Sequence, residues 1–209
     1  MLFRSGESQV LRLSRNQVIQ IIEPHLDSLY RIGAVPFQRY QAEYPNREIH
    51  LPRTRACILW DLMVTQARLE FRGIRGTQIL DPPSGITLLI LEDQIAVRFK
   101  KLDEDSLPRN YPTEAAKDWH RGEDLPGIPS SLQRLSMGYR LNRLQAAVEN
   151  VLISNTLAGR LLYDIILEAP ADGAILFDRN RSDSEGIDTQ RQQPQRRVRI
   201  RPSEEQAEM

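Results

Sequence analysis

The feature that most constrains the fold is a pair of short β-rich runs near the middle of the chain. Residues Ile86 to Leu91 are apolar almost throughout, whereas Ile95 to Lys101 alternate between large apolar side chains and small or cationic ones. The turn Glu92-Asp93-Gln94 between them is short enough for a β-hairpin. We therefore expect an antiparallel pair whose first strand is central and whose second strand is half exposed.

Helical periodicity precedes this hairpin. Ser14 and Gln17 have the spacing of a capping box, and the apolar residues after them recur at helical intervals. The pattern predicts a first amphipathic helix that Pro24 kinks or divides. An irregular connection is expected next from three punctuating residues, Gly33, Pro36 and Pro45.

A second helix is expected to begin between Pro52 and Thr54 and to end at Gly73. Its apolar residues fall on one broad face, Ile58, Leu59, Leu62, Met63 and Leu69. Cys57 is the one cysteine of the chain, which excludes an intramolecular disulfide, and its apolar neighbours predict a buried core thiol.

Further short runs complete the prediction of an α+β fold, with N-terminal helices packed on a mainly antiparallel sheet. Strands are predicted at 77–80, 135–141, 148–153 and 161–167. Residues 142–151 also allow a helix, and both interpretations stay open. Residues 102–133 read as a long loop interrupted by one short helix, which Thr113 would cap and which would carry Trp119 into the core and His120 at the surface.

The 209 residues suit one domain, which we place at 14–177, after an N-terminal extension at 1–13. Hydrophobic residues become rare after Phe177, and this composition predicts a disordered tail at 178–209 that is Arg-rich and then acidic. No export signal and no transmembrane run is recognised, so we expect a cytoplasmic protein without a membrane partner.

Metal and cofactor chemistry finds little support in the residue pattern. His25, His50 and His120 lie in separate segments, and the chain lacks the glycine-rich loops that hold nucleotide phosphates. Metal-dependent nucleases of the PD-(D/E)xK type place an acid two residues before the lysine, and Arg98 stands there before Lys100. We expect no metal and no cofactor.

The cations at the end of the hairpin indicate anion recognition. Strand alternation puts Arg98 and Lys100 on one face, and we expect cations of the second helix to converge there. The alternative is a surface ion network with Asp61, Glu70, Asp103 or Glu104. Asn110 and Thr113 either cap backbone groups or line a pocket. The candidate ligand-binding residues are Arg53, Arg55, Asp61, Arg68, Arg98, Lys100, Lys101, Asn110 and Thr113.

The tail offers a separate candidate for nucleic-acid binding. Residues 191–201 hold five arginines and no acid, and such a polyelectrolyte segment binds RNA by counterion release. Tails of this kind also serve as solubilising ends. The candidate residues are Arg196, Arg197, Arg199 and Arg201.

Five short motifs between Pro52 and Tyr139 resemble a small uncharacterised bacterial family: PRTRA at 52–56, VRFKKLD at 97–103, PRNYPT at 108–113, LPGIP at 125–129 and MGY at 137–139. The resemblance covers under half of the chain. It is to proteins encoded beside helix-turn-helix or ImmA-like peptidase proteins. This implies one component of a two-gene module similar to toxin-antitoxin pairs or phage-response switches, and it assigns no catalytic residues.

Three functions follow as hypotheses. The first is a partner-binding component that recognises an anionic group or a protein through the cationic hairpin. The second is a toxin-like enzyme acting on RNA or a nucleotide, in which Arg55, Arg98 and Lys100 hold phosphate and Asp61 or His50 acts as acid or base. The third is a nucleic-acid binder that uses the arginine-rich tail.

Overall fold

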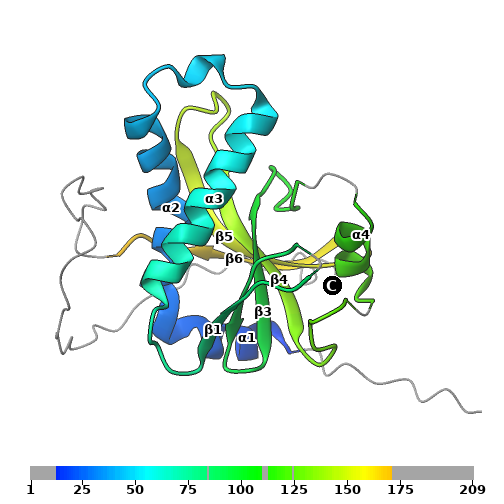
Figure 1. Cartoon of the computed structure of the whole chain (residues 1–209). Helices are drawn as coiled ribbons and strands as arrows, with labels where there is room; N and C mark the ends of the chain where they lie inside the picture. The colour runs from blue at the N-terminus through cyan, green and yellow to red at the C-terminus, as the bar shows by residue number, and fades with distance from the viewer. Residues whose placement is uncertain (1–12, 84, 110–112, 124, 171–209) are drawn as a thin grey trace, which may run out of the picture.

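The computed structural model describes residues 13–83, 85–109, 113–123 and 125–170 (Figure 1). The predicted tail at 178–209 and nearly all of the predicted N-terminal extension lie outside these residues. The helices are α1 (Arg15–Ile22), η1 (Glu23–His25), α2 (Leu26–Glu43), η2 (Arg47–Ile49), α3 (Pro52–Glu70) and α4 (Glu114–Arg121). The strands are β1 (Thr77–Leu80), β2 (Leu88–Leu91), β3 (Ile95–Lys101), β4 (Gln133–Leu141), β5 (Val148–Leu157) and β6 (Arg160–Leu167).

The six strands form one sheet in sequence order, which confirms the predicted α+β class. Every neighbouring pair is antiparallel except β3 and β4, which are parallel. Parallel strands need a long crossover, because the chain must return to the end of the sheet where it started. Residues 102–132 and the helix α4 within them form that crossover. The predicted hairpin is present as β2 and β3.

The N-terminal helices confirm part of the prediction. Ser14 and Gln17 form the capping box, and Pro24 lies in the 3₁₀ turn that separates α1 from α2. The predicted irregular connection is wrong, because α2 continues through both Gly33 and Pro36. Both residues are buried beneath the sheet, and this packing overrides the local cost of proline and glycine. At Gly33 an added Cβ would collide with a methyl group of Val151, so glycine lets α2 approach β5 closely.

Helix α3 begins where the sequence predicts and ends at Glu70, three residues before the predicted Gly73, and two of its side chains face away from the predicted core side. Leu59, Met63 and Ala67 are buried and line one side. Cys57 and Leu69 are exposed, which corrects the predicted core thiol and the predicted apolar face. Each lies two residues from this buried line, and at 3.6 residues per turn that separation points a side chain about 200° away.

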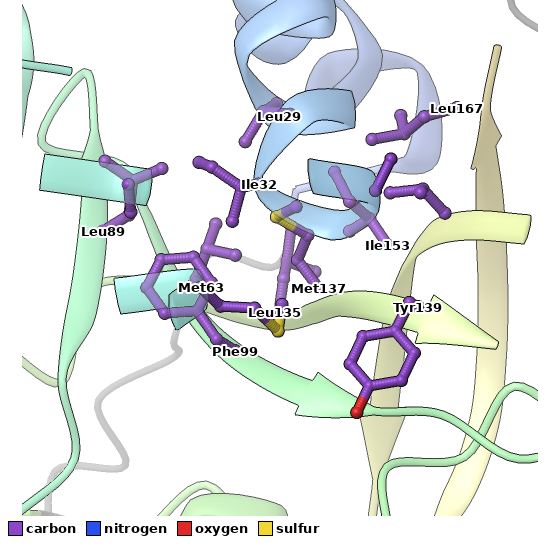
Figure 2. Close-up of a cluster of buried hydrophobic side chains, with 14 of the residues drawn as sticks. Leu29, Ile32, Met63, Leu89, Phe99, Leu135, Met137, Tyr139, Ile153 and Leu167 are labelled. Atoms are coloured by element: carbon purple, nitrogen blue, oxygen red, sulfur yellow. The ribbon is translucent and has the colours of Figure 1, made fainter. Parts of the chain in front are cut away.

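The sheet is covered on both faces, by different elements. Helices α2 and α3 pack on one face, where the buried side chains include Met63, Phe99 and Met137 (Figure 2). Helix α4 and the chain around it cover part of the other face, where Trp119 packs with Leu88 and Ala96. The expectation that β3 is half exposed is therefore wrong. Its residues 95–99 are all buried, because the crossover covers the face that alternation alone would leave to solvent.

The ambiguity at residues 142–151 is resolved in favour of a strand. Residues 142–147 form the turn between β4 and β5, where the side chain of Asn142 accepts hydrogen bonds from the backbone of Ala146 and Ala147. Strand β5 then runs further than predicted, to Leu157. Within the described part of the chain, no helix combines the length and the apolar character needed to cross a lipid bilayer.

Candidate functional site

The predicted ligand-binding cations divide between the two faces of the sheet. In β3, Val97 and Phe99 pack under α2 and α3, whereas Ala96 packs beside α4. Strand alternation therefore places Arg98 and Lys100 on the face that carries α4, and Lys101 on the face that carries α3. The predicted convergence of the α3 cations with Arg98 and Lys100 does not occur.

The remaining predicted residues of α3 have separate surroundings. Arg68 forms an exposed ion pair with Asp81, with 2.9 Å between the guanidinium nitrogen and the carboxylate oxygen. Asp61 is exposed, and its backbone carbonyl accepts a hydrogen bond from Thr65. Arg55 is the α3 cation that lies near Lys101. Burial, together with the charges of Arg55 and Arg109, lowers the pKa of Lys101.

Arg98 is the most deeply buried cation of the described chain, with 1% of its surface exposed. Its Nε donates a hydrogen bond to Ser136 Oγ at 2.9 Å, and its Nη2 donates to His120 Nε2 at 2.9 Å. The guanidinium carbon lies 5.0 Å from the ring centre of Trp119, and that of Arg134 lies 5.5 Å from the same ring. Two guanidinium groups thus contact one buried indole, which is a favourable cation-π arrangement.

The contact with Arg98 fixes the protonation of His120. An arginine cannot accept a hydrogen bond, so Nε2 of His120 carries no proton and the neutral ring holds its proton on Nδ1. Nδ1 then donates to Thr156 Oγ1 at 3.3 Å. Burial, followed by the charges of Arg98 and Lys100, lowers the pKa of His120 to about 4. His120 was predicted at the surface, whereas in the structure its ring is partly buried.

Burial and neighbouring positive charges also lower the pKa values of Arg98 and Lys100 in β3. Burial, with a contribution from Arg134, lowers the pKa of Arg98 to about 9, and burial with a contribution from Arg98 lowers that of Lys100 to about 8. Among the described residues, neither cation forms an ion pair with a carboxylate. The predicted alternative of a surface ion network is not formed here. Glu70 pairs with Arg31, and Asp103 accepts hydrogen bonds from its own turn.

Lys101 is on the other face of the sheet from Arg98 and Lys100, and it lies at an exposed end of the molecule. Its Nζ donates to Gln145 Oε1 in the turn between β4 and β5, and Gln41 of α2 donates to the carbonyl of Ala146 at 2.9 Å. These hydrogen bonds join β3 and α2 to the β4–β5 turn, and the connection between α2 and α3 lies at the same end of the molecule (Figure 1). We call the exposed part of this end the tip surface, which comprises Ile49, Leu51, Arg53, Arg55, Lys101 and Leu144.

The tip surface combines exposed apolar side chains with cations. Ile49, Leu51 and Leu144 are 75%, 71% and 83% exposed, the three largest values among the large hydrophobic residues described. Helix α3 begins here without a side-chain cap, since the residue at the capping position is Leu51. Its first turn contains no acid and carries Arg53 and Arg55. Side-chain caps and first-turn acids are what stabilise a helix N-terminus, so this helix start lacks both.

Two other predicted residues lie at the start of α4. Thr113 caps this helix and accepts a hydrogen bond from the backbone of Ala116 at 3.2 Å, which confirms the capping role. Asn110 lies outside the described residues. Trp119 is buried with 3% of its surface exposed, which confirms its predicted place in the core.

A small pocket of about 110 Å³ lies between the end of α4 and the strands β4, β5 and β6. His120, Arg134, Asn155 and Thr156 are among the residues that line it. Pockets that hold drug-sized ligands have volumes of about 300 Å³ or more. This one suits an ion or a few water molecules, and it is too small for the nucleotide of the enzyme hypothesis. Within them, no three His, Cys, Asp or Glu side chains gather to hold a metal ion.

Several residues around Arg98 and in the tip surface were not predicted from the sequence. Arg134 joins Arg98 beside Trp119 because β4 pairs with β3 in parallel, 38 residues along the chain from Arg98 to its register partner Ser136. No local pattern marks that pairing. The tip surface did carry a local signal, because Leu51 stands at the capping position before Pro52 and a run of cations.

Comparison of the chain with protein-family models, with curated proteins and with solved structures finds no match.

Proposed function

We propose that this protein is the partner-binding component of a bacterial or phage two-gene regulatory or defence module, and that it binds an acidic protein partner through the tip surface. The observation that carries the proposal is the start of α3. There an exposed leucine replaces the cap and two arginines replace the usual acids. Natural sequences depart from local rules of this kind mainly at functional sites.

The electrostatics of this helix start favour an anionic partner. The N-terminus of a helix carries a partial positive charge and unsatisfied backbone N–H groups, and each cation in the first turn typically costs about 0.3–1 kcal/mol. Arg53, Arg55 and the nearby Lys101 add to this field instead of compensating it. A carboxylate of a partner would relieve the repulsion and accept hydrogen bonds from the free N–H groups.

The apolar residues of the tip surface argue for a protein as the occupant. Ile49 and Leu51 flank His50, whose Nδ1 is hydrogen-bonded to the hydroxyl of Tyr40 at 2.8 Å, so this connection is held in place. Exposed large hydrophobic side chains rimmed by charges are typical of protein interfaces. The partner that fits is an acidic surface, or an amphipathic acidic segment, with apolar residues at its centre.

The resemblance of residues 52–139 supports a partner encoded beside this chain. The proteins that this segment resembles are encoded beside helix-turn-helix or ImmA-like peptidase proteins. The cationic hairpin takes part through Lys101, whereas Arg98 and Lys100 face α4. The enzyme hypothesis stays a prediction, without a shared cleft for Arg55, Arg98 and Lys100. RNA binding by Arg196, Arg197, Arg199 and Arg201 also stays a prediction, since these residues lie outside the described ones.

Charge reversal at the tip surface tests this proposal. The double substitution Arg55→Glu and Lys101→Glu is expected to weaken binding of the purified product of the neighbouring gene about 100-fold or more, because each lost charged contact is worth about tenfold. Isothermal titration calorimetry with the full-length chain measures the change. The matched control is Lys117→Glu with Arg160→Glu, which alters net charge equally at exposed positions elsewhere. Equal loss in both variants, or no binding by the unaltered protein, would count against the proposal.

A further inference from the structure

Lys100 is a partly buried ammonium group for which the described residues provide no counter-charge. None of the hydrogen bonds or ion pairs among the described residues involves its Nζ. Its neighbour Lys101, by contrast, donates to Gln145. A desolvated ammonium without a partner is costly, because burial penalises its charged form.

The groups that surround Lys100 increase its positive field. Arg98 lies two residues away on the same face of β3 and lowers the pKa of Lys100 through its charge. His120 of α4 is close enough for Lys100 to lower the pKa of its ring. On β4, the residue in register with Lys100 is Gly138, which brings no side chain. Nothing described here supplies a negative charge to this group of side chains.

Arg98 has a further hydrogen-bond donor group beside Lys100. Its Nε is used by Ser136 and its Nη2 by His120, and its Nη1 has no acceptor among the described residues. The hydrogen bonds to Ser136 and His120, with the indole of Trp119 at 5.0 Å, fix the plane of the guanidinium. An immobilised guanidinium next to an ammonium that has no partner among the described residues is a donor set suited to a tetrahedral oxyanion.

We propose that Arg98 and Lys100 form a binding site for a single tetrahedral oxyanion, such as a phosphate group. The three N–H groups of Lys100 and the Nη1 of Arg98 donate to its oxygens. Neutral His120 holds the guanidinium in place and takes no part in binding. The site lies on the opposite face of the sheet from Lys101, so it is independent of the tip surface and of the protein partner proposed above.

Intrinsic fluorescence offers a direct test, because Trp119 contacts Arg98. The chain has two tryptophans, so Trp60→Phe leaves Trp119 as the reporter. Titration of this variant with sodium phosphate and with sodium sulfate, at constant ionic strength, is expected to give a saturable change. Adding Lys100→Gln is expected to weaken binding about tenfold or more, since a charge-assisted contact is lost. The control Lys117→Gln removes an exposed lysine of α4 and is expected to leave the affinity unchanged.

The dependence on pH gives a second readout, which a purely structural role of Lys100 would not produce. Sulfate keeps its charge between pH 6.5 and 8.5, so a change of affinity reports on the protein. Among the described residues, Arg98 and His120 face Lys100. This range stays below the pKa of about 9 of Arg98, which keeps most of its charge, and His120 is already neutral in it. Binding is expected to weaken as Lys100 loses its proton above a pKa of about 8, and this weakening should vanish in Lys100→Gln. Absence of saturable binding, or equal affinity with and without Lys100, would overturn the site.

Discussion

Replacing Gly138 by alanine is expected to destabilise the protein by about 3 kcal/mol, the upper range for overpacking of a core. Gly138 lies in β4 in register with Lys100 of β3, and an added Cβ would collide with the carbonyl oxygen of Lys100. That oxygen belongs to the backbone of a central strand and cannot move aside as a side chain would. The single parallel strand pair of the sheet must therefore separate to accept the methyl group.

Urea denaturation followed by far-UV circular dichroism measures this effect. The comparison variant is Gly73→Ala, where an added Cβ meets nothing within 4 Å but the residue has φ +72°. Placing alanine in this left-handed region typically costs about 1–2 kcal/mol. The free energy of unfolding should thus fall clearly further in Gly138→Ala than in Gly73→Ala. The reverse order would show that β3 and β4 are not packed as described.

Replacing Trp119 by alanine is expected to cost about 4 kcal/mol, within the usual range for a buried tryptophan. Trp119 is the large side chain by which α4 packs on the sheet, together with Leu88 and Ala96. Its loss also removes the ring that lies beside the guanidinium groups of Arg98 and Arg134, and leaves both facing a cavity.

The variant Trp119→Phe separates the two contributions of this side chain. It keeps an aromatic face for the guanidinium groups while removing part of the buried volume, so it should lose less than half as much stability as Trp119→Ala. Chemical denaturation of both variants beside the unaltered chain provides the measurement. A loss below about 0.5 kcal/mol in Trp119→Ala would mean that α4 is not anchored by this residue, since surface substitutions have effects of that size.

The sequence was most informative where local chemistry decides local structure. The hairpin at 88–101, the capping box of Ser14 and the cap of Thr113 depend on neighbouring residues and were predicted. The path of α2 through Gly33 and Pro36 was not, because packing against β5 decides it. The same holds for the burial of β3 on both faces, which depends on a crossover that returns the chain to β4.

In the candidate site, too, the features that depend on neighbouring residues were predicted, and those that depend on distant packing were not. Alternation along β3 correctly put Arg98 and Lys100 on one face, but it does not reveal which helix covers that face. The predicted partners from α3 were therefore assigned to the wrong side, and Lys101 is the residue that lies near Arg55. The uncapped, arginine-bearing start of α3 was visible in the sequence. The position of the β4–β5 turn at the same end of the molecule was not, because it depends on hydrogen bonds from Gln41 of α2 and Lys101 of β3 to that turn.

The most direct test of the proposed function is a hydrogen–deuterium exchange footprint of the complex with the neighbouring gene product. Binding at the tip surface should slow exchange in two segments that are distant in sequence, residues 47–55 and 142–147. Exchange in α4 and in the turn between β5 and β6 should stay unchanged. Protection confined to α4 or to residues 157–162, with no change at the tip surface, would contradict the proposed interface.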